Sequence, residues 1–138
     1  INPRSAANDS TANQLPFSGA VMTGDTLYLS GVLGTGDTAE AAAAAGLNSM
    51  QNLLKAAGMT MDDLVSVQIF CPDVSNYDAF NKVYREFFAT DPPARATVQV
   101  AGLNLGAKIE IQMIAARSRV CSISGSNVRT PRSQRMIE

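Results

Sequence analysis

The sequence has 138 residues, 46% of them apolar and 17% charged, and a formal net charge of −1, which is the balance of one compact globular domain. It contains no histidine and only two cysteines, which excludes Ser-His-Asp and Cys-His catalytic arrangements, an imidazole base, and zinc sites built on histidine or on four cysteines. No run of about 18 uninterrupted apolar residues occurs, so no membrane-spanning helix is predicted.

The N-terminal residues 1–14 are rich in Asn, Ser, Ala and Thr and show no periodicity, so we expect a flexible arm. After them, Phe17–Thr23 and Thr26–Ser30 flank a Gly24-Asp25 turn and predict a β-hairpin. We place the predicted domain over residues 15–118, which contain every predicted strand and helix.

Three glycines, Gly31, Gly34 and Gly36, follow the hairpin and predict a loop. They lack the Lys-Ser/Thr pair of a phosphate loop, and their spacing differs from the dinucleotide-binding pattern, so nucleotide binding is not favoured. The preferred interpretation is a loop whose backbone approaches a ligand closely.

A first helix is predicted over residues 39–57, where apolar side chains recur at helical spacing. Asp37 and Glu40 have the spacing of a capping box at its start. Gly58 stands where a left-handed cap would end the helix.

A buried strand and a second helix come next. Residues 64–70 are rich in β-branched side chains and predict the strand, which Cys71 follows as an expected buried, unreactive thiol. Ser75 or Asn76 is expected to cap a helix that ends at Ala89, before a proline pair.

Two last strands are predicted over residues 95–101 and 108–116. The resulting order, ββαβαββ, predicts an α+β fold: one mixed sheet with both helices on one face. We pair the last two strands as an antiparallel hairpin centred between Gly102 and Leu103, which sets Arg95 opposite Glu110.

In this register the two strands would share one polar face and one apolar face, the apolar one under the helices. Spacing alone favours a solvated cross-strand ion pair between Arg95 and Glu110. The alternative is a polar face covered by another subunit, where Arg95 would bind a substrate carboxylate and Glu110 would hold or activate a water molecule. The spacing does not decide between them. The predicted polar face consists of Arg95, Thr97, Gln99, Lys108, Glu110 and Gln112.

Charge is distributed unevenly along the chain. Residues 1–116 contain six basic and eleven acidic residues, a net charge of −5, which argues against nucleic-acid binding. The five arginines and one glutamate of residues 117–138 give +4, and residues 119–138 are expected to form a basic, disordered tail. We expect a cytoplasmic protein, or an exported one if a signal peptide preceded Ile1.

Several motifs resemble the Rid family, also called the YjgF/YER057c/UK114 family. The strongest are Pro93–Ala101, with Pro-Ala-Arg at its start, and Lys108–Ala115, which contains Lys-Ile-Glu-Ile. The resemblance covers about residues 15–118. Further segments that fall in the family's order are Leu29–Gly31, Ala56–Met59, Asp63–Val65 and Tyr77–Phe88.

The resemblance implies a chorismate-mutase-like fold in a homotrimer with a central β-barrel and three clefts between subunits. It also implies hydrolysis of reactive 2-imino or enamine acids to 2-oxo acids and ammonia, without a cofactor or metal. The expected partners are a small imino-acid or other carboxylate substrate and further copies of the chain, with neither nucleic acid nor membrane.

The resemblance also assigns site residues. Arg95 matches the arginine that binds the substrate carboxylate, and Glu110 matches the glutamate that positions the attacking water. Gly31 would line the pocket through its backbone, and Asn81 would border it. Thr97 stands where many members have a cysteine that offers its backbone carbonyl to the water site.

Phe17 departs from the family, because it replaces a tyrosine and so removes a hydroxyl near the ligand. This change keeps a second hypothesis open, a trimeric binding or regulatory protein for small carboxylates without turnover. A third, an endoribonuclease or translation inhibitor, is disfavoured by the acidic body and the absence of histidine. The sequence leaves the states of Cys71 and Cys121 open.

Overall fold

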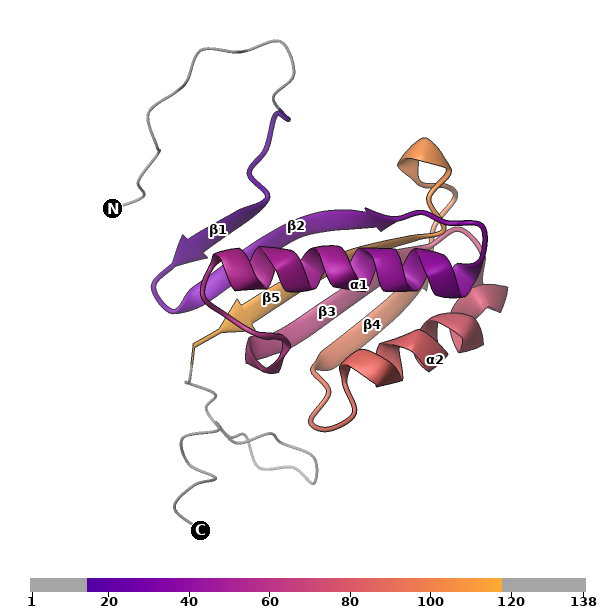
Figure 1. Cartoon of the computed structure of the whole chain (residues 1–138). Helices are drawn as coiled ribbons and strands as arrows, with labels where there is room; N and C mark the ends of the chain where they lie inside the picture. Colours follow the sequence, from indigo (N-terminus) through magenta and orange to yellow (C-terminus); the bar gives the residue numbers. More distant parts are fainter. Residues whose placement is uncertain (1–14, 118–138) are drawn as a thin grey trace.

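The computed structural model describes residues 15–117, so the predicted arm over 1–14, the tail over 119–138 and Cys121 lie outside the described residues. The ββαβαββ order is confirmed (Figure 1). The elements are β1 (Ala20–Thr23), β2 (Thr26–Gly34), α1 (Ala39–Ala56), η1 (Met61–Asp63), β3 (Leu64–Cys71), η2 (Val74–Asn76), α2 (Tyr77–Phe87), β4 (Ala94–Gln99), η3 (Asn104–Gly106) and β5 (Ile109–Ala116), where η denotes a 3-10 helix.

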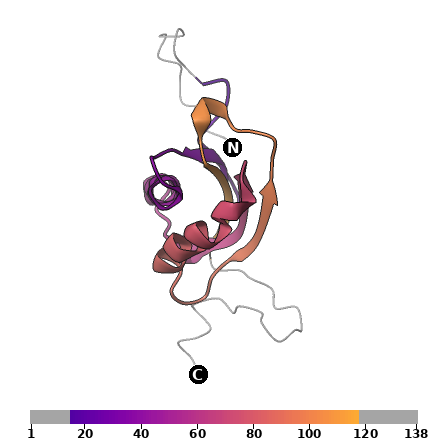
Figure 2. The same ribbon diagram turned by 90° about the vertical axis from the view of Figure 1, so that its right-hand side faces the viewer.

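The strands form one mixed sheet in the order β1-β2-β5-β3-β4. Only β3 and β4 are parallel, and the other neighbours are antiparallel. Both helices cover the same face of the sheet, as Figure 2 shows from the side. The predicted α+β class is therefore confirmed, and we call the uncovered side of the sheet the open face.

The predicted hairpin between the last two strands is wrong. β4 lies at the edge of the sheet, where Arg95 is beside Val67 of β3. β5 lies between β2 and β3, and Glu110 is flanked by Leu33 and Phe70. The physical reason is the connection through α2, because a strand–helix–strand unit joins parallel neighbours and so commits β4 to β3.

Two of the three glycines that predicted a loop lie inside β2. The register between β2 and β5 shifts between Leu29 and Val32, so a β-bulge occurs at Ser30 and Gly31. Gly34 lies where α1 crosses the sheet, and a Cβ there would overlap the carbonyl oxygen of Ala42. Glycine at these two positions therefore allows other parts of the fold to pack closely against β2.

The helix ends follow the predictions in part. Thr38, not Asp37, caps α1, because its Oγ1 accepts the Ala41 N–H at 3.1 Å. The left-handed cap after α1 is confirmed: Gly58 has a φ of +71° and donates its N–H to the Lys55 carbonyl at 3.0 Å.

The start of α2 was predicted less well. Asn76 is its N-cap residue but makes no side-chain cap hydrogen bond, and Ser75 lies in η2. The turn is fixed instead by Asp73, whose carboxylate accepts the Ser75 N–H at 2.9 Å. Hydrogen bonds from Ser75 lower the pKa of Asp73.

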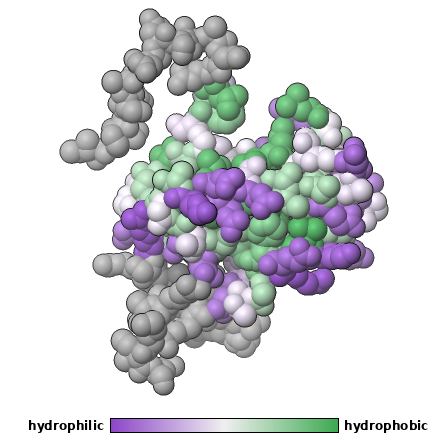
Figure 3. Space-filling model, viewed as in Figure 1, coloured by the Kyte–Doolittle hydropathy of each residue, from purple (hydrophilic) through white to green (hydrophobic). Residues whose placement is uncertain are grey.

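The core fills the space between the helices and the sheet, while the outward side of α1 carries a hydrophilic patch beside weakly apolar surface (Figure 3). Cys71 is buried, as predicted, and desolvation is the main cause that raises the pKa of its thiol. No helix within residues 15–117 is long and apolar enough to cross a membrane. The largest fully buried side chains are Leu29, Leu47, Met50, Leu54, Leu64, Val67, Cys71, Ile109, Ile111 and Met113.

The crossing of α1 over β2 generates a stability prediction. Gly34→Ala is expected to lower the free energy of unfolding by about 1–3 kcal/mol, because the new methyl group overpacks against the α1 backbone. Gly102→Ala is the matched control, since no atom lies within 4 Å of a Cβ there, and we expect a change within about 0.5 kcal/mol. Urea unfolding midpoints at one protein concentration measure both, and equal midpoints would contradict the packing argument.

Candidate functional site

Arg95 points from β4 toward α2, where two tyrosines hold its guanidinium. One guanidinium nitrogen, Nη2, donates a hydrogen bond to the Tyr77 hydroxyl at 3.2 Å. The guanidinium carbon lies 4.6 Å from the centre of the Tyr84 ring and 5.6 Å from that of Tyr77. These cation–π and hydrogen-bond contacts come from phenol groups, so they orient the cation without a carboxylate.

The spacing of α2 supplies this arrangement. Tyr77, Asn81 and Tyr84 are separated by four and then three residues, which places them on one side of the helix. Asn81 is half-buried and hydrogen-bonds the Tyr77 side chain. That bond is the largest cause lowering the pKa of Tyr77, and the positive charge of Arg95 is the next.

Thr97 lies two residues beyond Arg95 on the same face of β4, level with buried Ile69. Its Oγ1 is buried and has no hydrogen-bond partner among the described residues. We call Tyr77, Asn81, Tyr84, Arg95 and Thr97 the arginine cluster. Sequence reasoning found three of its members and missed the two tyrosines, although their helical spacing with Asn81 was a usable signal.

Glu110 lies on the open face of the sheet and is the second residue of β5. Its carboxyl group packs directly over the bulge of β2, because a Cβ at position 31 would overlap the Glu110 carboxylate. The absence of a side chain at Gly31 therefore lets the Glu110 carboxyl group lie in this position. The Gly31 backbone remains exposed. The close approach of the Gly31 backbone to a ligand stays a prediction; within the described residues, the group that lies against Gly31 is the Glu110 side chain.

Two hollows meet at Gly31 and Glu110. The larger has a volume of about 790 Å³ and extends toward Phe17 and the η3 loop. The smaller has a volume of about 470 Å³ and extends toward Phe70 and Gln112 on the open face. Glu110 can thus reach a small molecule in either hollow, and we call Glu110, Gly31 and Phe17 the glutamate side.

Arg95 and Glu110 do not share the predicted polar face. Arg95 is level with buried Val67 and faces α2, whereas Glu110 is level with Phe70 and faces the open side. The strand β3 lies between them and their levels differ by three residues along it, so their backbones are about 14 Å apart. The cross-strand ion pair is therefore wrong, and so is a single polar face carrying both groups.

The other members of the predicted polar face divide in the same way. Gln99 faces the helices, where its Oε1 accepts the Val74 N–H at 3.0 Å, and Thr97 lies on that face too. Gln112 lies on the open face with Glu110, and Lys108 precedes β5. Val98 belongs to the face that was predicted to lie under the helices, and this is wrong, because Val98 is 47% exposed on the open face.

Metal ligands do not gather in the part of the chain that the structure describes. Within residues 15–117, no group of three or more His, Cys, Asp or Glu side chains could hold a metal ion. The charged groups available at the candidate site are the Arg95 cation and the Glu110 carboxylate.

Comparison with known proteins identifies relatives over the whole described region. The family model described as Endoribonuclease L-PSP matches residues 8–117. A RutC family protein of Sulfurisphaera tokodaii is 33% identical over 110 residues, which cover 74% of this chain and 88% of that protein. The human 2-iminobutanoate/2-iminopropanoate deaminase is 34% identical over 75 residues, 54% of this chain and 55% of that protein.

The fold has close structural counterparts as well. The crystal structure of RidA from an Antarctic Psychrobacter matches with a TM-score of 0.72 and 31% identity, over 77% of this chain and 92% of the other. Several curated relatives match over a shorter stretch. The chain spans about half the length of these relatives, which include the human deaminase.

The arginine cluster predicts a perturbed tyrosine. The pKa of Tyr77 is expected to lie below the ordinary value of about 10, because Asn81 and Arg95 favour its phenolate. Selective ¹³Cζ-tyrosine NMR during a pH titration follows each of the three tyrosines. Asn81→Ala and Arg95→Gln should each raise the pKa of Tyr77, because each removes a group that favours its phenolate. An unchanged Tyr77 titration in both variants would contradict these contacts.

Proposed function

The chain belongs to the endoribonuclease L-PSP family, also called the Rid family, and we propose that it hydrolyses small 2-imino acids to 2-oxo acids and ammonia in clefts between subunits. One observation carries the proposal: the arginine cluster and the glutamate side are two complementary halves on opposite faces of one sheet. A carboxylate held by Arg95 can meet Glu110 only when the glutamate comes from a second copy of the chain. The deaminase named among the relatives supports the reaction type.

The proposed chemistry needs one cation and one carboxylate. The Arg95 guanidinium forms two parallel hydrogen bonds to the substrate carboxylate and so fixes C2 of the imino acid. Glu110 of the neighbouring copy accepts a proton from a water molecule as the water oxygen bonds to C2. Glu110 then gives this proton to the nitrogen, which leaves a carbon that bears both a hydroxyl and an amino group. Glu110 next takes the hydroxyl proton and passes it to the amino nitrogen, the C–N bond breaks as the C=O bond forms, and the 2-oxo acid and ammonia leave without any change of oxidation state.

The remaining candidates have supporting roles in this proposal. Tyr77 and Tyr84 hold the guanidinium, and Asn81 holds Tyr77. Thr97 offers its carbonyl or its buried hydroxyl to the water. Gly31 lets the Glu110 carboxylate lie against the β2 backbone, where the substrate would approach it.

Self-association is part of the proposal. The open face of the sheet carries the exposed apolar side chains of Val21, Tyr28 and Val98, which a second copy would cover. We propose a closed homotrimer with this face inside, as the family resemblance implies. Such a ring repeats one contact between different surfaces, and this contact can bring Arg95 of one copy to Glu110 of the next.

A second candidate is a binding protein for small carboxylates without turnover. Phe17 favours it, because this residue lines the hollow at Glu110 and brings no hydroxyl there. Tight binding of pyruvate through Arg95 without imine hydrolysis would select this function. The net charge of −5 over residues 1–116 still argues against RNA as the substrate.

Truncation of the guanidinium tests the proposed reaction. Arg95→Ala is expected to lower kcat/KM for 2-iminopropanoate about 10–100-fold, because the substrate loses its charged hydrogen-bond partner. The kcat/KM of Arg95→Lys should fall between those of the wild type and Arg95→Ala, because lysine keeps the positive charge and loses the two parallel hydrogen bonds of the guanidinium. Arg85→Ala, at an exposed arginine of α2, is the control and should match the wild type. Equal rates for all variants and buffer would refute the proposal.

Mixed assemblies test the origin of the two groups. Arg95→Ala and Glu110→Gln are each expected to keep at most about one tenth of the wild-type activity as pure proteins. When co-expressed in equal amounts, each site receives its Arg95 and its Glu110 from different copies, so about one quarter of the sites are intact. We therefore expect about one quarter of the wild-type activity. A mixture as inactive as its parents would show that both groups act from one copy.

A further inference from the structure

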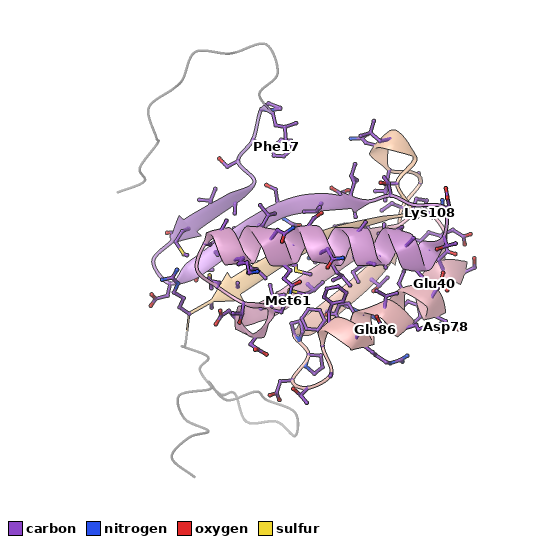
Figure 4. All side chains as sticks on the ribbon, viewed as in Figure 1. Phe17, Glu40, Met61, Asp78, Glu86 and Lys108 are labelled. Carbon is purple, nitrogen blue, oxygen red and sulfur yellow. The ribbon has the colours of Figure 1, made fainter. Side chains whose placement is uncertain are left out.

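The larger hollow beside Glu110 is mainly apolar. Its three polar side chains are Ser30, Asn104 and Glu110, and the Ser30 hydroxyl already donates to the Ser18 carbonyl at 2.6 Å. Figure 4 shows Phe17 on the segment before β1, on the same side of β2 as the η3 loop. The apolar residues that line the hollow are Leu15, Phe17, Val32, Leu33, Leu53 and Leu105.

Leu105 in the η3 loop stands out on two independent grounds. Its φ is +56°, in the left-handed region that a branched apolar residue rarely adopts. Its side chain is also 89% exposed, so burial in the protomer does not compensate for the strained backbone. Figure 3 shows the apolar projection that the η3 loop forms on the upper edge of the molecule. Strained residues of this kind cluster at binding and active sites, so Leu105 at the edge of the hollow is a candidate ligand contact.

We propose that this hollow receives the substrate side chain, that the protein prefers 2-imino acids with a large apolar side chain, and that Leu105 determines this preference. The inference rests on the proposed function, because it assumes that the reacting carbon lies at Glu110. From that carbon, a side chain of the size found in leucine or phenylalanine extends between Phe17 and Leu105. A volume of about 790 Å³ is within the range of small-molecule sites and exceeds the needs of a methyl group.

The composition of the hollow also excludes other substrate side chains. A hydroxyl or amide that lies against leucine and phenylalanine would lose its water partners, and Asn104 is the one polar side chain of the hollow that could replace them, besides Ser30 and Glu110. A basic side chain would compete for Glu110, the carboxylate needed for the water. The apolar surface therefore favours substrate side chains with more carbon atoms, and each additional buried methylene group increases the preference for the longer side chain.

Imines made by D-amino-acid oxidase serve as test substrates. D-amino acids are suitable precursors because C2 of the imine is planar, so either enantiomer of the amino acid gives the same imine. The oxidase transfers two electrons from the amino acid to O2 and releases the imine with H2O2, which catalase removes. The substrates are D-alanine, D-leucine and D-arginine. We expect kcat/KM for the leucine-derived imine to exceed that for the alanine-derived imine about ten-fold or more.

Two variants at position 105 separate contact from folding. Leu105→Asn introduces a polar residue that tolerates a positive φ, and it should reduce the leucine-to-alanine ratio about ten-fold. Leu105→Met keeps an apolar side chain and should keep the ratio. Light scattering of both variants should give the wild-type mass. Loss of assembly in Leu105→Asn would make Leu105 an interface residue and overturn the proposal.

Binding of the products distinguishes failure of this inference from failure of the proposed function. Calorimetric titration should show 4-methyl-2-oxopentanoate binding about ten-fold more tightly than pyruvate, with the difference lost in Leu105→Asn. Such binding without imine hydrolysis would support the hollow as the site of the apolar side chain and would refute the proposed deaminase activity. Equal binding of the two acids, a preference for the alanine- or arginine-derived imine, or an unchanged ratio in Leu105→Asn would overturn the inference.

Discussion

The alternation of side chains across the sheet is the constraint on which the proposed chemistry depends. Arg95 shares its face with Val67 and the helices, and Glu110 projects from the opposite face with β3 between the two strands. No rotamer change carries either group through a hydrogen-bonded sheet. The proposed chemistry requires both groups and therefore two chains, so assembly is a condition for the proposed activity.

Much of the fold could be predicted because local signals were strong and independent. Turn glycines, β-branched runs and helical periodicity gave the ββαβαββ order, and Gly58 gave a helix end. The pairing of β4 was missed because alternation along a strand says which residues share a face and nothing about the neighbouring strand. The link through α2 contained that information, since strand–helix–strand units join parallel strands.

The candidate site was predictable residue by residue but not as an arrangement. The Pro-Ala-Arg and Lys-Ile-Glu-Ile motifs identified Arg95 and Glu110, yet no motif fixes the face on which a side chain lies. Tyr77 and Tyr84 were missed because a tyrosine on an amphipathic helix is usually core, and only the fold brings these two against a cation. Long-range contacts of this kind depend on packing between elements, which sequence spacing does not encode.

Gly31 also sets where the acid can lie. A β-carbon at this position would overlap the Glu110 carboxylate, so alanine or serine there would turn the carboxylate away from the β2 backbone. Because the carboxylate is the far end of a flexible side chain, such a change relocates the acid within the hollow without removing it. A single methyl group at a position that carries no chemistry of its own would thus reposition the catalytic base of the proposed reaction.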